Sequence, residues 1–246
     1  MLAPCSDRSL YHTHSAVSLF FPARNEEAYI EKAVAWAITV LAALTDRFEV
    51  IIVDDASTDR THELALELER RYPQVRVLHH AVNQKLGGSV RSALSVATGD
   101  LVIYSDIDLP FNLWEIHRAV RLLDEHDADI LSAFRLNRTA EGVKRIVYSY
   151  AYNFLIRAAF GASIRDVNFS FKVVRRRVLD RIRLKSRGSF IDAELLVKAR
   201  NAGFKLIQIG VDYFPRDMGE SMLATPGVIV QMLAEGVYLF RECRRP

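Results

Sequence analysis

The stretch Glu49-Val-Ile-Ile-Val-Asp-Asp-Ala-Ser-Thr-Asp-Arg-Thr61 decides the predicted fold. It opens with a β-branched apolar run, Glu49–Val53, of the kind that forms buried strands. Polar residues from Asp54 to Asp59 end that run, and Thr61–Arg71 then has the composition of a helix. The stretch therefore predicts one unit of strand, loop and helix.

The same unit occurs on both sides of this stretch. Val17–Phe21 is an apolar strand candidate that ends at Pro22, and a helix is expected from about Glu26. Further on we expect a strand at Val75–His79, a helix at Gly87–Ala97 and a strand at Leu101–Tyr104. Such alternation predicts an α/β domain with a mostly parallel sheet flanked by helices.

The second half of the chain is less regular. Helices are expected near Asn112–His126, Val143–Phe160 and Asp192–Ala202, and strands near Asp129–Ala133, Phe169–Val174 and Lys205–Val211. No internal repeat or linker is visible, so the chain reads as one domain. The expected organisation is a loose arm over residues 1–15, the domain over 16–225 and an amphipathic helix over 226–246.

Composition excludes several classes of protein. The 33 basic and 30 acidic residues give a net charge of +3, too near neutral to argue for nucleic acid binding. Cys5 and Cys243 lie far apart in the sequence, and the seven histidines show no ligand spacing, which argues against a disulfide framework and a zinc site. No apolar run approaches the roughly 20 residues of a spanning helix, so a cytoplasmic protein is expected.

The triplet Asp106-Ile-Asp108 is the first candidate for chemistry. It directly follows an apolar strand candidate, and two such carboxylates can hold a hard divalent cation, Mg²⁺ or Mn²⁺, that binds a diphosphate. A lone triplet also occurs in ordinary surface turns. The acidic pair Asp54-Asp55 at the same predicted sheet edge favours a site, because carboxylates gathered there repel one another without a cation or ligand.

Three further stretches resemble family 2 glycosyltransferases. Val17-Ser-Leu-Phe-Phe-Pro-Ala-Arg-Asn-Glu-Glu27 resembles the opening strand and P-x-Y-N-E loop of that family, and Glu49–Thr61 resembles its V-D-D-x-S-x-D-x-T segment. Asn83-Gln-Lys-Leu-Gly-Gly-Ser-Val-Arg-Ser-Ala93 is similar to the N-x-G-K-G-G-A-V-R stretch of dolichyl-phosphate glucose synthases. The resemblance implies a GT-A fold and an inverting transfer of a sugar from a UDP- or GDP-sugar to a polyprenyl, dolichyl-type phosphate.

The resemblance also implies site residues. Pro22, Glu26 and Asp55 would contact the nucleoside, as would Arg24, which replaces the usual aromatic residue and can itself stack on a base. Lys85 falls in the nucleotide-binding stretch. Asp106 and Asp108 would organise the metal and the diphosphate, and at Pro110 some relatives have a metal-binding Gln.

Three segments of the second half resemble polyprenyl-phosphate sugar synthases. They are Asp166-Val-Asn-Phe-Ser-Phe-Lys172, Phe190-Ile-Asp-Ala-Glu-Leu-Leu196 and Pro215-Arg-Asp-Met-Gly-Glu-Ser221. Ser170 replaces a glycine of the first pattern, and Met222 replaces a lysine that follows the third. Asp192 and Glu194 point in different directions on a helix, so one of them is expected to reach the site, with a solvated helix start as the alternative.

Arginines are candidates for binding an anionic acceptor. Arg135 and Arg145 align with positions that face the acceptor phosphate in polyprenyl-phosphate mannose synthases, and Arg216 belongs to the segment beside the diphosphate. The basic run from Arg175 to Arg187 is read either as a solvated face or as a patch for anionic lipid. The aromatic segment Tyr148–Phe160 is read as core packing or as a lipid-facing groove.

Three functional readings stay open. The first is the polyprenyl-phosphate transferase, with a membrane surface as a further partner on the cytoplasmic face. The second transfers the sugar to a hydroxyl and requires Asp192 as the base. The third is a nucleotide-sugar-binding protein without activity, which the departures at Arg24, Pro110, Ser170 and Met222 motivate. A dinucleotide-dependent oxidoreductase is a weaker rival, because no G-x-G-x-x-G follows the first strand.

Overall fold

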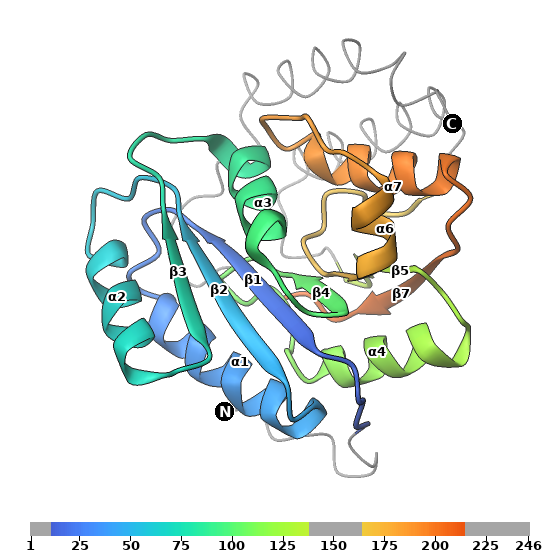
Figure 1. Cartoon of the computed structure of the whole chain (residues 1–246), viewed down its shortest axis with the longest axis horizontal. Coiled ribbons are helices and arrows are strands. Elements are labelled where there is room, and N and C mark those ends of the chain that lie inside the picture. Colours follow the sequence, from blue (N-terminus) through green and yellow to red (C-terminus); the bar gives the residue numbers. More distant parts are fainter. Residues whose placement is uncertain (1–10, 138–163, 215–246) are drawn as a thin grey trace.

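A seven-stranded sheet forms the centre of the molecule (Figure 1). The computed structural model describes residues 11–137 and 164–214. The strand order is β3-β2-β1-β4-β6-β5-β7, and every strand except β6 runs in one direction. The prediction of a mostly parallel sheet is confirmed. The strands are β1 (Val17–Ala23), β2 (Phe48–Asp54), β3 (Val75–His79), β4 (Leu101–Tyr104), β5 (Ile130–Arg135), β6 (Lys172–Arg175) and β7 (Leu206–Val211).

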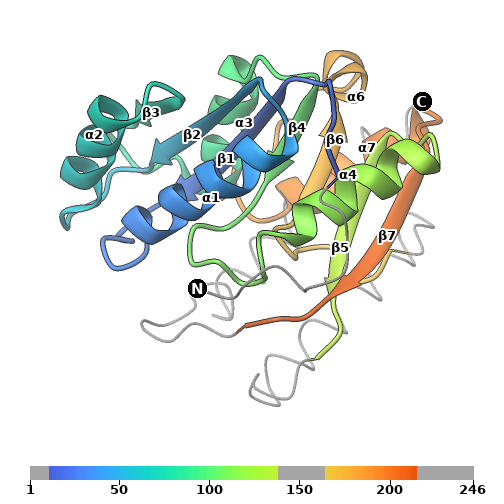
Figure 2. The same cartoon turned by 90° about the horizontal axis from the view of Figure 1, so that it is seen from below.

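Helices cover both faces of the sheet (Figure 2). One face carries α1, α2 and α4, and the other carries α3, α6 and α7. Across residues 11–137 and 164–214, no helix combines the length and the apolar character needed to cross a bilayer. The helices are α1 (Ile30–Leu44), α2 (Thr61–Arg71), α3 (Lys85–Val96), α4 (Glu115–Glu125), α6 (Arg176–Arg181) and α7 (Ile191–Asn201).

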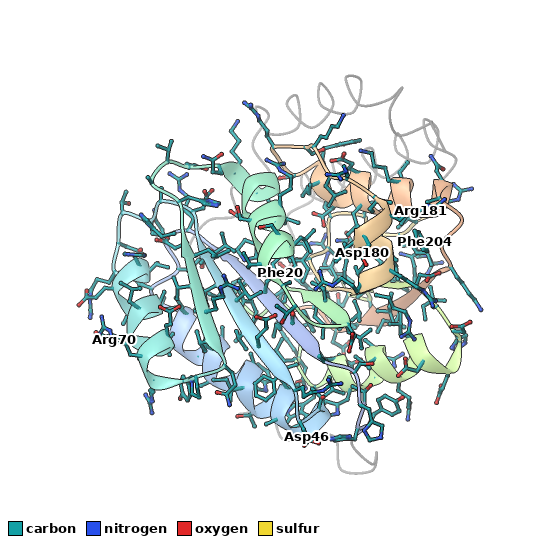
Figure 3. The ribbon with its side chains drawn as sticks, in the orientation of Figure 1. Phe20, Asp46, Arg70, Asp180, Arg181 and Phe204 are labelled. Atoms are coloured by element: carbon teal, nitrogen blue, oxygen red, sulfur yellow. The ribbon has the colours of Figure 1, made fainter. Side chains whose placement is uncertain are left out.

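The apolar composition of the central strand β1 follows from its burial on both faces. Leu19 and Phe21 pack into the core beneath α1, whereas Phe20 belongs to the core beneath α3. Figure 3 shows Phe20 deep in the molecule, while Asp46 and Arg70 lie at its periphery. Because both faces of β1 are buried, its sequence is a continuous apolar run and does not alternate with polar residues.

Three element starts differ from the prediction by three or four residues. The helix expected from Asn112 begins at Glu115, after a turn closed by the Asn112 carbonyl. The helix expected from about Glu26 begins at Ile30, because the Glu26 carbonyl accepts hydrogen bonds from the backbone of Tyr29 and Ile30 in a turn that precedes the helix. The strand expected from Phe169 begins at Lys172, because Phe169 lies in another turn closed by the Asp166 carbonyl. The expected helices over 143–160 and 226–246 lie outside the described residues.

The loose arm expected over 1–15 is held in place where the structure describes it. The Tyr11 hydroxyl donates to Asp124 at 2.7 Å, and the Tyr11 carbonyl contacts His117 Nδ1 at 2.9 Å. Thr13 is buried and donates its backbone N–H to the Leu44 carbonyl. Residues 11–15 are therefore part of the packed domain.

The first three arginines of the basic run are structural. Arg175 donates to Asp124, Arg177 donates to Asp129, and Arg176 donates to the carbonyls of residues 97 and 99. These partners lie at the amino ends of β4 and β5, opposite the predicted site. Arg175 and Arg176 are thus partly buried and connect β6 and α6 to neighbouring loops, whereas the Arg177 side chain is 55% exposed, as expected of a solvated face.

Gly87 allows the loop before α7 to reach α3. Its N–H donates to the Arg187 carbonyl at 2.9 Å, and Arg91, one turn later, donates to the Ser186 carbonyl. A Cβ at position 87 would lie 2.2 Å from the Ser186 carbonyl oxygen and 2.7 Å from the Arg187 carbonyl carbon. The space that this glycine leaves is thus filled by the chain's own backbone.

Gly87→Ala is expected to lower the free energy of unfolding by about 1–2 kcal/mol. Alanine gains about 1 kcal/mol of helix propensity, but a clash this close with backbone costs about 2–3 kcal/mol, the upper part of the range for overpacking, because a loop cannot rotate away as a side chain can. Urea denaturation measures the difference. Ser95→Ala, at an exposed position of the same helix, is the matched control and should not destabilise. A Gly87→Ala variant at least as stable as the wild type would contradict this account.

Candidate active site

The carboxyl ends of β1, β2, β3 and β4 meet at one edge of the sheet because these strands are parallel. Strained backbone gathers at this edge. Of the six described non-glycine residues with positive φ, Asp127 alone lies elsewhere. The other five are Asn25 (57°), Ala56 (56°), Lys85 (61°), Leu109 (56°) and Asp166 (49°). Such conformations persist where the surrounding structure imposes them, often at functional sites.

The charges of three carboxylates raise the pKa of one buried tyrosine at this edge. Tyr104, the last residue of β4, stacks on Phe20 with ring centroids 5.1 Å apart. Burial is the main cause that raises the pKa of Tyr104 well above its usual value, and the charges of Asp106, Asp192 and Asp108 raise it further. Asp106 and Asp108 are both partly exposed. The acidic triplet and Asp192 are therefore neighbours in space although they are far apart in the sequence.

The donor set of the triplet suits a hard cation. Asp106 and Asp108 offer carboxylate oxygens, which Mg²⁺ and Mn²⁺ prefer. Their partial exposure leaves room for further oxygen ligands. Pro110 is buried and supplies no side-chain oxygen, so it cannot replace the metal-binding Gln of some relatives.

A buried ion pair lies beside the acidic triplet. Lys172 Nζ lies 2.5 Å from Asp192 Oδ1, and it also donates to the Phe169 carbonyl at 2.7 Å. The Lys172 side chain has no exposed surface and that of Asp192 is 3% exposed. Burial raises the pKa of the Asp192 carboxyl, and the charge of Lys172 opposes that rise. Sequence reasoning missed Lys172, because no pattern indicates which acid a strand lysine meets.

Glu194 has a structural role, and Asp192 is the acid of α7 that lies near the acidic triplet. Its carboxylate accepts the backbone N–H groups of Lys185 and Ser186 at 2.8–3.0 Å, and it pairs with Lys198. It is fully buried. The two acids of α7 point to different surroundings as predicted, whereas the alternative of a solvated helix start is wrong for both.

The predicted nucleoside contacts lie at the end of β1 and in the loops after β1 and β2. Pro22 is partly exposed near the end of β1, and Glu26 is buried beside α2, with its backbone N–H donating to Thr61 Oγ1 at 2.7 Å. Arg24 Nη1 is buried and makes no hydrogen bond. Asp55 accepts hydrogen bonds at Oδ1 from His80 and from the Gln84 backbone, at 2.8 and 2.7 Å.

Hydrogen bonds join these two loops. Asn25 donates its backbone N–H to Ser57 Oγ at 3.0 Å and accepts at Oδ1 from the Thr58 backbone at 2.8 Å. The Arg60 backbone donates to Glu27. Lys85 begins α3, on the third loop of the same edge, and is exposed. The structure therefore brings the predicted nucleoside residues to one side of the acidic triplet.

Arg135 ends β5 and is already paired. Asp166 holds its guanidinium at two points, with Nε–Oδ2 and Nη2–Oδ1 distances of 2.7 Å each. The ring of Tyr213 packs against it at 5.2 Å, and its side chain is 8% exposed. Ser170 lies in the segment Asp166–Lys172, which also contains Asp166. It is buried, so the fold accommodates it in place of a glycine. Arg145, Arg216 and Met222 lie outside the described residues.

Three histidines lie beside the acidic pair Asp54-Asp55. The spacing of histidines in the sequence did not reveal this arrangement. His62 and His79 approach Asp54 at 3.0 and 2.8 Å, and His80 contacts Asp55 at 2.8 Å. They come from α2, from β3 and from the loop after β3. Because ligands on separate elements have no fixed spacing in the sequence, a search for motifs such as HxxxH does not find them.

Comparison with known proteins gives a matching family model and two curated relatives. The family model described as "Glycosyl transferase family 2" matches residues 18–183. Glycosyltransferase AglD of Haloferax volcanii is 32% identical over 207 residues, which is 81% of this chain and 33% of that protein. The undecaprenyl-phosphate 4-deoxy-4-formamido-L-arabinose transferase of Photorhabdus laumondii is 27% identical over 208 residues, 83% of this chain and 62% of that protein.

The fold also occurs in a solved enzyme. Glucosyl-3-phosphoglycerate synthase from Mycobacterium tuberculosis, in complex with Mn²⁺, uridine diphosphate and phosphoglyceric acid, superposes with a TM-score of 0.73. The match covers 94% of this chain and 80% of that one at 20% identity, and therefore concerns the fold. The chain spans a third of the first curated relative and under two thirds of the second.

Lys172→Met is expected to destabilise the protein, and more so at high pH. Removing one partner of a buried ion pair costs about 3–5 kcal/mol, because the other charge stays buried alone. The pKa of Asp192, already raised, should rise further without Lys172. Folding then favours the neutral acid, so the loss grows as pH rises through that higher pKa. Urea denaturation at pH 5 and pH 8 measures this dependence.

The control for that experiment is Lys32→Met, an exposed lysine on α1, which should change stability by less than about 0.5 kcal/mol at either pH. An equal loss for Lys172→Met at both pH values would show that the destabilisation does not come from an ionised Asp192.

Proposed function

The chain belongs to glycosyl transferase family 2, and on that premise we propose that it is an inverting glycosyltransferase that moves a sugar from a nucleotide diphosphate sugar to a polyprenyl phosphate. The observation that carries the proposal is that Asp106, Asp108 and Asp192 all act on one buried side chain, Tyr104, at the carboxyl edge of the sheet where the predicted nucleoside loops begin. Carboxylates gathered at one edge favour the binding of a cation there.

The donor nucleotide would bind across the loops after β1, β2 and β3. The two hydrogen bonds to Asp55 both engage Oδ1, so Oδ2 can accept from a ribose hydroxyl or a base N–H. Arg24 offers a buried guanidinium nitrogen without a hydrogen bond, and a guanidinium can also stack on a base. Pro22 and Glu26 would form the wall of the nucleoside pocket, and Lys85 would face the phosphates.

Asp106 and Asp108 would hold Mg²⁺ or Mn²⁺. A divalent cation there supplies positive charge to the diphosphate leaving group. The carboxylates fix its place because both follow directly from β4, which is paired on both sides within the sheet. The Tyr104 side chain forms a hydrogen bond with Asp106.

The acceptor phosphate would approach from the side of β5 and β6. A phosphate oxygen attacks the anomeric carbon, the bond from that carbon to the diphosphate breaks, and the nucleoside diphosphate leaves. A phosphate is already a nucleophile and requires no general base. Arg135, Arg145 and Arg216 would position it, with Asp166 fixing the direction of the Arg135 guanidinium. One curated relative is named as an undecaprenyl-phosphate transferase.

Such an acceptor places the enzyme at a membrane surface. We propose a peripheral location on the cytoplasmic face, with the expected amphipathic helix over 226–246 against the lipid. Anionic headgroups would be attracted by the exposed residues in the second part of the basic run, Arg181, Arg183, Lys185 and Arg187.

Transfer of radiolabelled sugar tests the proposal. UDP-glucose, GDP-mannose and UDP-N-acetylglucosamine are offered in turn with polyprenyl phosphate and Mg²⁺ or Mn²⁺. One donor should label the lipid, and Asp108→Asn should reduce the rate by about 10²-fold or more, because the leaving-group charge is no longer offset. Asp46→Asn, an exposed position far from the site (Figure 3), should keep full activity. No turnover of any donor would favour a binding protein without activity.

A hydroxyl acceptor is the second candidate function. It is favoured by one observation, the raised pKa of the buried Asp192, since a general base is most effective when its pKa lies near the working pH. Asp192 would take the hydroxyl proton as the oxygen attacks the anomeric carbon. The ion pair with Lys172 argues against this role, because it already engages Oδ1.

Asp192→Asn separates the two acceptors. With polyprenyl phosphate as acceptor we expect the variant to retain kcat within about tenfold, because no proton has to be removed. With a hydroxyl acceptor the loss should be about 10²–10⁴-fold. Steady-state kinetics on the acceptor found in the transfer assay gives the answer, and circular dichroism confirms that the variant is folded. A loss of 10²-fold or more with the lipid acceptor would contradict the proposed mechanism.

A further inference from the structure

We propose that Asp54, His62 and His79 form a transition-metal site, with Zn²⁺ as its preferred ion, separate from the Asp106-Asp108 pair. Each of the three side chains offers one ligand atom, and these atoms lie within 4.8 Å of one another. They come from the ends of β2 and β3 and from the first turn of α2. The site would therefore join three elements at the outer end of the carboxyl edge.

The geometry converges on one carboxylate oxygen. His79 Nδ1 lies 2.8 Å from Asp54 Oδ2, and His62 Nδ1 lies 3.0 Å from the same oxygen. Ligands of a tetrahedral Zn²⁺ are about 3.3–3.6 Å apart, given bond lengths of about 2.0–2.2 Å. An outward shift of a few tenths of an ångström would therefore admit the ion.

The hydrogen-bonding pattern is incomplete without an ion. His62 Nδ1 is buried, yet its approach to Asp54 does not make a hydrogen bond. Asp54 has no exposed side-chain surface, and its other oxygen, Oδ1, accepts the Ser57 backbone N–H at 3.1 Å. That bond directs Oδ2 toward both imidazoles, as contacts behind a metal ligand commonly do.

The ligand chemistry selects the ion. Two neutral imidazoles and one carboxylate suit Zn²⁺ and neighbouring transition metals, whereas Mg²⁺ prefers oxygen ligands alone. The His62 and His79 side chains are 37% and 44% exposed, so both imidazoles border the solvent from which water would complete the coordination of an ion. The site of Asp54, His62 and His79 and the Asp106-Asp108 pair would thus bind different metals at the same edge of the sheet.

The proposal has a structural consequence for the nucleoside loops. Ser57 and Thr58, which follow Asp54, hold Asn25 of the β1 loop, and His80, which follows His79, contacts Asp55. An ion at Asp54 would fix the starts of both segments. We therefore expect Zn²⁺ to stabilise the folded chain in the absence of any nucleotide.

Isothermal titration of the metal-free full chain with ZnCl₂, and separately with MgCl₂, tests the site. We expect one Zn²⁺ per chain with a rise in Tm, and binding weakened by at least about 10–100-fold in His62→Asn and in His79→Asn. His126→Asn, an exposed histidine at the end of α4, is the matched control and should bind as the wild type does. Asp106→Asn should also retain the Zn²⁺, which separates this site from the catalytic one.

Two results would overturn the proposal. One is the absence of Zn²⁺ binding by the wild type. The other is equal binding by the wild type and by a histidine variant that circular dichroism shows to be folded, because the ion would then lie elsewhere on the chain. If one histidine variant does not fold, the other decides between these outcomes.

Discussion

Parallel pairing of β1 with β2 and with β4 is the constraint on which the site depends. The register places Ala23 opposite Asp54 and Phe20 opposite Tyr104, so the loops that follow these strands leave the sheet at one edge. Acidic residues end β2 and follow β4, and parallel strands cannot send those residues to opposite edges. Specific partners lie beside the acids of this edge: histidine side chains contact Asp54 and Asp55, and the cation of Lys172 offsets the charge of Asp192. The acidic triplet is the place where an added cation would serve the same purpose.

Much of the fold could be predicted because its signals are local. Apolar runs such as Val17–Phe21 mark strands buried on both faces, and polar clusters mark the loops after them. What local patterns missed depends on contacts between distant residues. The late start of α1 results from a turn at Glu26, and the roles of Arg175, Arg176 and Arg177 depend on partners about 50 to 80 residues earlier in the sequence.

The candidate site shows the same division. The place of Asp106 and Asp108 directly after a strand could be predicted, as could the loops after β1 and β2, whose contacts with a nucleoside stay a prediction. The sequence could not reveal that Lys172 pairs with Asp192, or that His62 and His79 meet at Asp54, because each pair joins separate elements. Nor could it show that Arg135 is held by Asp166. These partners determine which charges are available for a ligand, and that information exists only in three dimensions.

The most direct test of the central claim is a crystal structure of the chain with uridine diphosphate and Mn²⁺, in which anomalous scattering locates the metal. The account predicts a manganese ion about 2.0–2.6 Å from carboxylate oxygens of Asp106 or Asp108 and from the diphosphate, with the nucleoside between the β1 and β2 loops. Manganese bound only at Asp54, His62 and His79, or a nucleotide bound away from the carboxyl edge of the sheet, would contradict it.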